Sequence, residues 1–148
     1  MLAQTLNTLF SRDLVKLREE IALYRNENNL WIVDKKITNS AGNLCLHLVG
    51  NLNAYIGAVF GNTGYIRNRD LEFSQKDVSK AELLEKIDAT RHVVESALNT
   101  VTAEQLNKEY PEKVFDFTMT TEYFLVHLSM HLAYHLGQIN YHRRLLDV

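Results

Sequence analysis

The chain has 148 residues, the usual size of one globular domain and too few for two well-packed ones. Its 46% apolar and 23% charged residues exclude a disordered chain, and a single proline with six glycines favours long helices over a many-turned β-sandwich. The formal net charge of −2 argues against a protein that tracks nucleic-acid phosphates. We expect one all-α domain over residues 1–148 that has no nucleic-acid partner.

The first predicted helix covers residues 2–24, where apolar residues recur at spacings of three and four. This start lacks the basic region and long apolar core of a signal peptide or anchor. No stretch of the chain approaches the roughly 18 apolar residues of a membrane span, so no membrane partner is expected. The polar run 26–29 ends the helix. Trp31 follows, and we expect it to pack over the bundle end, with a ligand contact as the less favoured alternative.

The second predicted helix begins at Asn39 or Ser40, both good N-caps, and continues to about Gly61. It has no charged residue from 41 to 62, which predicts that most of its circumference is buried. Three of its glycines fall within a narrow arc, which favours close approach of a neighbouring helix or subunit: Gly50, Gly57 and Gly61. A charge-free circumference is hard to cover with three partner helices, so we expect a homodimer.

The only cysteine is Cys45, which cannot form an internal disulfide. A chain without disulfides fits a reducing compartment, and we expect a cytoplasmic protein. Cys45 points away from the side of the helix that carries His47, which predicts a core residue and not a ligand.

The remaining segments predict the topology. The linker 62–78 is long enough, at about 3.3 Å per residue, to return along a helix of about 30 Å, so the second and third helices should run parallel. The third helix, 79–100, opens with a capping box and carries a core stripe of Leu84, Ile87, Val94, Leu98 and Val101, and 102–105 forms a second box. The last helix begins at Thr120 or Thr121 and ends near Leu146. The expected architecture is a four-helix bundle with a long crossover connection.

Four of the six histidines lie in the last helix. His131 and His135 differ by only about 40° around it, and such a pair can offer two nitrogens to one divalent metal ion. Exposed helices also carry such pairs by chance, but the interleaved leucines here indicate a half-buried helix. His127 lies on the same side, either as a fourth ligand or, as we prefer, as a pocket-wall residue.

A third ligand is expected from another helix, and His47 is the candidate. Asn43 lies one turn before it and Asn51 one turn after it, so all three form a polar inward stripe. The alternative is a core histidine held by asparagine side chains. Three histidines with open positions describe a reactive metal site, because a closed structural site normally fills four positions.

Two motif segments resemble the DinB-like superfamily of metalloenzymes. They are Ser40-Ala-Gly-Asn-Leu-Cys-Leu-His47-Leu-Val-Gly-Asn51-Leu and His131-Leu-Ala-Tyr-His135-Leu-Gly-Gln138-Ile. The central Arg67-Asn-Arg69-Asp-Leu-Glu72-Phe73-Ser74 resembles a segment of one uncharacterised bacterial branch. The resemblance implies a DinB-like four-helix bundle with a crossover, often dimeric, that holds nickel, zinc or a similar divalent ion.

In that superfamily one ligand histidine comes from the second helix and two come from an HxxxH in the last helix. The matching positions are His47, His131 and His135. Leu136 stands where the family often has arginine, which we expect to alter the entrance and not metal binding. Relatives include S-transferases and an isomerase that use low-molecular-weight thiols, so the resemblance implies a small-molecule substrate.

Other polar residues receive plainer interpretations. His92 should be solvated, and His142 should complement the charge of a helix end. For Arg67 and Arg69 a linker salt-bridged to Asp70 and Glu72 is favoured over attraction of an anionic substrate. Gln138 could hydrogen-bond a neighbouring helix backbone or a ligand histidine, and we prefer the structural role. No acidic residue can be placed beside the metal as general base.

These observations favour a metal-dependent enzyme, of thiol S-transferase or hydrolase type, that acts on a small molecule. The first alternative is a non-catalytic metal-binding or stress-response bundle. The second is an interaction domain without metal whose histidines pack in the core.

Overall fold

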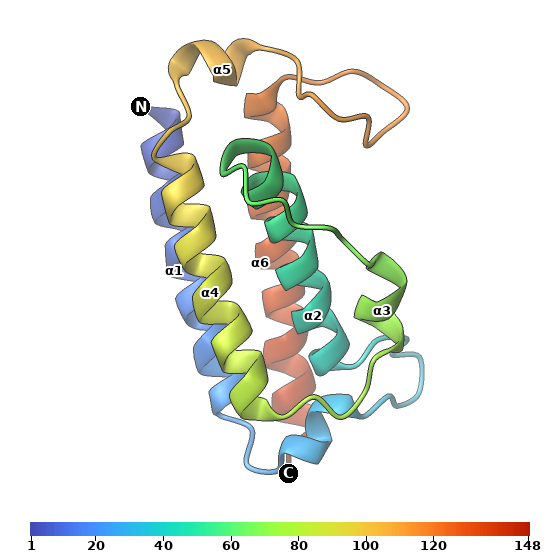
Figure 1. Ribbon diagram of the computed structural model, residues 1–148. Helices are drawn as coiled ribbons and strands as arrows, with labels where there is room; N and C mark the ends of the chain where they lie inside the picture. The colour runs from blue at the N-terminus through green and yellow to red at the C-terminus, as the bar shows by residue number, and fades with distance from the viewer.

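The computed structural model describes residues 1–148, and its long helices lie side by side as a bundle (Figure 1). The four long helices are α1 (Leu2–Ala22), α2 (Ala41–Leu52), α4 (Lys80–Leu98) and α6 (Thr121–Leu146). The short ones are η1 (Glu27–Trp31), η2 (Asn53–Ala58), α3 (Arg69–Ser74) and α5 (Ala103–Asn107). None of these helices combines the length and the apolar character that spanning a bilayer requires. The all-α prediction is confirmed.

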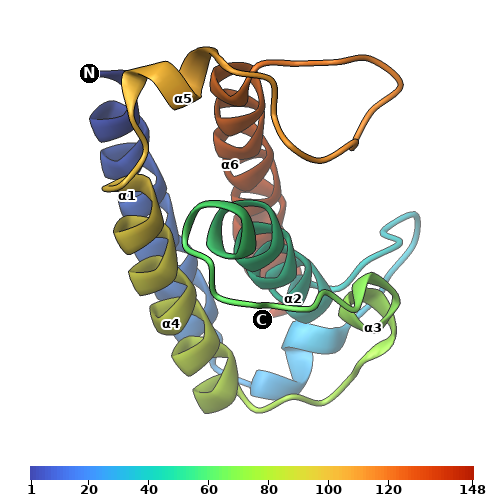
Figure 2. The same cartoon turned by 45° about the horizontal axis from the view of Figure 1, so that its top comes forward.

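Figures 1 and 2 show that α2 and α4 run in the same direction, opposite to α1 and α6. This is the arrangement that the length of the linker 62–78 predicts. The linker also contains a helix that the sequence did not predict, α3, which packs beside α2. The Asn68 side chain caps α3 by accepting a hydrogen bond from the backbone N–H of Leu71 at 3.2 Å.

Side-chain caps start three of the four long helices, α2, α4 and α6, at the predicted places. Ser40 accepts a hydrogen bond from Asn43 N–H, Ser79 from Glu82 N–H, and Thr120 from Tyr123 N–H. The complete reciprocal box occurs at Thr102 and Gln105, before α5. The wider π-helical turn η2 continues α2, so the second helix ends close to the predicted Gly61.

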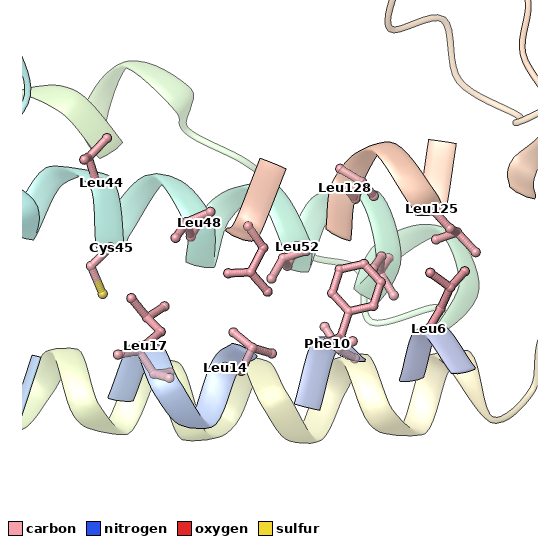
Figure 3. Packing of buried hydrophobic residues seen from close by; sticks show 14 of the residues in the cluster. Leu6, Phe10, Leu14, Leu17, Leu44, Cys45, Leu48, Leu52, Leu125 and Leu128 are labelled. Atoms are coloured by element: carbon pink, nitrogen blue, oxygen red, sulfur yellow. The ribbon is translucent and has the colours of Figure 1, made fainter. Parts of the chain in front are cut away.

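The hydrophobic core runs along the inside of the bundle. Figure 3 shows leucines of α1 pointing toward side chains of α2 and α6, with Leu14 facing the region of Leu48 and Leu52. Cys45 is completely buried, and burial raises the pKa of its thiol to about 12, as expected for a core residue. On α4 one predicted core position is wrong, because Leu83 is buried and Leu84 is only half-buried.

The charge-free second helix is covered by its own chain. Every α2 residue except Val49 is buried. A Cβ at Gly42 would lie 2.6 Å from the Trp31 ring, so Trp31 packs over the start of α2 as predicted. A Cβ at Gly57 would lie 2.8 Å from Val93 of α4. The close approaches are therefore made within one chain, and α2 gives no reason to expect a partner subunit. Dimerisation itself stays a prediction.

His142 has a different role from the predicted one. It is 4% exposed and lies between two elements, with its Nδ1 2.7 Å from the Tyr24 hydroxyl and its Nε2 2.9 Å from the Ile32 carbonyl oxygen. A carbonyl oxygen only accepts, so Nε2 carries the proton and Nδ1 accepts from Tyr24. Helix-end charge complementarity is therefore wrong for His142, because burial lowers the pKa of its imidazole. The residue joins α6 to the connection after α1.

Replacing His142 with leucine should destabilise the fold. The substitution leaves the buried Tyr24 hydroxyl and the Ile32 carbonyl without partners, which costs about 1–3 kcal/mol. We expect the melting temperature, followed by circular dichroism at pH 7.5, to fall by several degrees. The exposed His92→Leu change serves as control and should leave it unchanged.

The same variant tests the pKa of His142. Because burial lowers this pKa below the unfolded value of about 6.5, the unfolded chain binds more protons as the pH falls. The free energy of unfolding should therefore decrease between pH 7.5 and pH 5, and decrease less in His142→Leu. An equal decrease in both proteins would contradict the assigned environment.

Candidate metal centre

The three histidines predicted as ligands lie together between α2 and α6. His47 comes from α2, while His131 and His135 come from successive turns of α6. The Nε2 atom of His131 is 3.1 Å from Nε2 of His47 and 3.1 Å from Nε2 of His135. One ligand atom from each of the three lies within 4.8 Å of the other two. This cluster could hold a metal ion.

Hydrogen bonds on the far side of two rings fix their protonation. His47 Nδ1 donates to Glu72 Oε1 at 3.0 Å, because an ionised carboxylate only accepts. His135 Nδ1 donates to the side-chain oxygen of Gln138 at 2.7 Å. A neutral imidazole has a single proton, so both rings present a bare Nε2 lone pair to the cluster. Carboxylate and amide partners of this kind typically orient histidine ligands.

His131 stands between these two lone pairs. A neutral His131 can donate one N–H, so at most one of the two 3.1 Å contacts is a hydrogen bond and the other brings lone pairs together. Burial and the neighbouring imidazoles lower the pKa of His131 to about 3, so protonation does not relieve this crowding near neutral pH.

A divalent cation among the three nitrogens would satisfy all of them. Tetrahedral zinc with Zn–N bonds of 2.0–2.1 Å has ligand nitrogens about 3.3 Å apart, close to the spacing found here. The donor set therefore fits a metal. His131 Nδ1 is the one atom of the three rings that is buried without a protein partner.

Glu72 is a buried carboxylate held by a fork of hydrogen bonds. Arg67 Nε lies 2.9 Å from Glu72 Oε2, and Arg67 Nη2 lies 2.9 Å from Oε1. Burial raises the pKa of Glu72, but the hydrogen bonds from His47 and Arg67 outweigh that effect and lower it. Glu72 is therefore ionised beside His47, and it keeps the His47 proton on Nδ1.

Two residues of α2 make room for Glu72 and anchor its segment. A Cβ at Gly50 would overlap Glu72 Oε2, so the carboxylate occupies the space that glycine leaves. Asn43 Nδ2 donates to the Glu72 carbonyl at 3.0 Å and to the Gln75 carbonyl at 2.8 Å. The predicted stripe of Asn43, His47 and Asn51 is buried as expected, but Asn43 holds α3 and the Asn51 Oδ1 has no partner.

Other candidate residues lie outside the cluster. His127 stacks on Phe124 and meets Phe115 edge-on, with its ring centre 6.3 Å from that of His131. His127 therefore lies beside the cluster and is not part of it. Gln138 bonds His135, a candidate ligand, which was the less favoured of its two alternatives, whereas His92 is exposed as expected.

The predicted salt bridges of the linker are only partly present. Arg67 pairs with Glu72. Arg69 instead lies over the Phe73 ring, 5.2 Å from its centre, and Asp70 forms no ion pair.

A cavity of about 470 Å³ adjoins His135, a volume typical of small-molecule sites. Its lining includes Lys36, Ile37, Leu44, Tyr134, Gln138 and Tyr141. A larger hollow of about 710 Å³ lies open between α1 and α4 and contains none of the histidines. Leu136 packs against the core and does not line the cavity beside His135.

The sequence matches the family described as "protein of unknown function (DUF1572)" over residues 4–147. The chain belongs to this family. No curated protein matches the chain. The DUF1572 match covers all the segments that form the candidate site, from His47 on α2 to Gln138 on α6.

Sequence reasoning about this DUF1572 chain missed Glu72 as the partner of His47, a candidate ligand. The sequence offered Glu72 only as a salt-bridge partner within the linker, because nothing local connects it to His47, 25 residues earlier. The available signal was Gly50, one turn after His47, since a glycine in a buried helix marks a close approach. The approaching group was a side chain and not a second helix.

Replacing Glu72 with glutamine should weaken metal binding. The amide keeps the shape but loses the charge that orients and polarises His47, and losing such a partner costs about 10- to 100-fold in metal affinity. Competition with a chromophoric chelator measures this change. Asp70→Asn on the same helix is the matched control, because Asp70 is exposed and unpaired.

A second variant, on α2, disturbs the same Glu72 carboxylate. Gly50→Ala places a methyl group where Glu72 Oε2 lies and should weaken metal binding to a similar extent. Circular dichroism should remain helical in both variants. Unchanged affinity in both would show that Glu72 does not support the site.

Proposed function

We propose that this protein is a DinB-like metalloprotein in which His47, His131 and His135 bind one divalent ion, nickel or zinc. We further propose a metal-dependent enzyme that acts on a small molecule, of thiol S-transferase or hydrolase type. The observation that carries the proposal is the convergence of three Nε2 atoms, two of them bare because Glu72 and Gln138 hold the opposite ring nitrogens.

Several residues around the cluster would each help to hold such an ion in a different way. Arg67 keeps Glu72 ionised, and Glu72 keeps the His47 tautomer and ring orientation. Phe73 lies against His47 with ring centres 4.8 Å apart and limits the access of water on that side. A bound divalent ion with an open position would lower the pKa of a bound water or thiol toward neutrality.

The cavity supports a small-molecule substrate. It shares His135 with the cluster, and its tyrosine and leucine side chains suit an apolar body while Lys36 supplies a cation. A thiol is a fitting co-substrate because soft sulfur binds nickel and zinc well. Glu72 is occupied by Arg67 and His47, so we assign no general base. The alternative remains a metal-binding or stress-response bundle without turnover.

Metal content tests the ligand set. Protein purified without a histidine tag should contain about one divalent ion per chain by elemental analysis. His131→Ala and His135→Ala should lose most of it because each removes one of three donors. His92→Ala should keep it, since His92 is exposed on α4. Full metal occupancy in the His131→Ala protein would contradict the assignment of His131 as a ligand.

A substrate screen separates the enzyme from the non-catalytic bundle. Metal-loaded protein should consume a low-molecular-weight thiol together with an electrophile, or cleave an ester or amide, and His131→Ala should not. Loss of free thiol and appearance of product are followed in parallel. Metal binding without turnover of any member of the panel would favour the non-catalytic alternative.

A further inference from the structure

One side of α6 faces solvent without carrying charge. From Tyr123 to His142 the helix contains no Asp, Glu, Lys or Arg. Exposed apolar side chains recur there within an arc of about 100° at 3.6 residues per turn. These residues, which we call the α6 stripe, are Tyr123, Val126, Met130, Tyr134, Tyr141 and Leu145. Met130, Tyr134 and Tyr141 are each about two-thirds exposed, at 66%, 65% and 65%. Soluble proteins rarely expose so continuous an apolar surface without a partner for it.

The size of the α6 stripe fits a protein interface. It extends for about 33 Å at 1.5 Å per residue. Its three tyrosines together still expose about 300 Å², because a whole aromatic side chain buries 150–250 Å². With the aliphatic members the stripe offers on the order of 600 Å², about three quarters of the roughly 800 Å² that each partner contributes to a standard interface.

The charges at the two ends of α6 indicate which partner fits. Glu122 lies at the start of the stripe and Arg144 near its end. Arg143 is paired with Glu20, whereas Arg144 forms no ion pair and rests over the Tyr141 ring. In an antiparallel pair of identical helices, Glu122 of each copy lies beside Arg144 of the other. The stripe is therefore complementary to itself under a two-fold axis.

The middle of the stripe also suits an antiparallel pair. An exposed Ala133 and Gly137 lie there one turn apart, and a Cβ at Gly137 would meet nothing within 4 Å. With Glu122 opposite Arg144, the pair is centred on Ala133, so a small side chain of each helix faces the other at the two-fold axis and the helices can approach closely. A membrane is a less suitable occupant, because the stripe lacks the basic residues that attract anionic lipid.

We propose that two copies of this chain pack their α6 stripes antiparallel to form a homodimer. Tyr134, Tyr141 and Leu145 belong both to the stripe and to the lining of the cavity beside His135. The second copy therefore lies across that edge of the cavity and completes its wall. This surface replaces α2, whose charge-free face the chain covers by itself.

Light scattering across the micromolar range tests the dimer. The native chain should show twice its 17.1 kDa mass. Met130→Glu places a carboxylate in the centre of the interface and should weaken dimerisation at least about tenfold. Leu23→Glu is the control, because Leu23 is 56% exposed and lies outside the stripe. Met130 contributes little to the chain's own core, so circular dichroism should not change.

A charge reversal tests the antiparallel register. Glu122→Lys and Arg144→Glu should each weaken dimerisation several-fold by placing like charges together, and the double variant should recover it. A native chain that stays at 17.1 kDa overturns the proposal, whether or not it binds lipid vesicles. A dimer that Leu23→Glu weakens and Met130→Glu does not, or one without recovery in the double variant, overturns it as well.

Discussion

The buried carboxylate of Glu72 is the group on which the arrangement of the candidate site depends. It accepts the His47 Nδ1 proton and thereby leaves Nε2 bare toward the other two imidazoles. A buried charge is costly unless it is paired, and the Arg67 guanidinium supplies both hydrogen bonds and the opposite charge. The space for this pair comes from the missing side chain at Gly50. A single glycine on α2 thus permits a charge network that controls the protonation of the cluster.

The crossover explains how an acidic residue from the linker reaches α2. Because α2 and α4 run in the same direction, the chain must return along the bundle between them (Figure 2). That return passes the outer side of α2 and carries α3 with it, where Asn43 fixes two backbone carbonyls. A tight hairpin between these helices would have contained no segment to cover His47. The topology that brings the helices together also supplies the hydrogen-bond partner of the candidate ligand His47.

The sequence allowed the four long helices and the three histidines to be predicted for local reasons. Caps such as Ser40 and Thr120 act within one turn, and the spacing of His131 and His135 places both on one face. The pairing of Glu72 with Arg67 was predicted, but its bond to His47 was missed and His142 was misread, because these partners lie far away in the chain. His142 near the C-terminus would be exposed on an isolated helix, and it is buried only because the connection after α1 folds over it. A local sequence pattern cannot predict a side-chain role that depends on the path of a distant loop.

The charge-free run of α6 follows from its place between two environments. One flank carries His131 and His135, where an added charge would lie against the imidazole cluster and change its protonation. The neighbouring flank carries the exposed stripe, where an unpaired charge would have to lose its water if a second helix packed on it. The helix itself needs no such restriction, since charged residues are good helix formers and would be stable on a solvated face. Folding of the monomer therefore does not require the absence of charge on the exposed flank, whereas the proposed contact between two α6 stripes does.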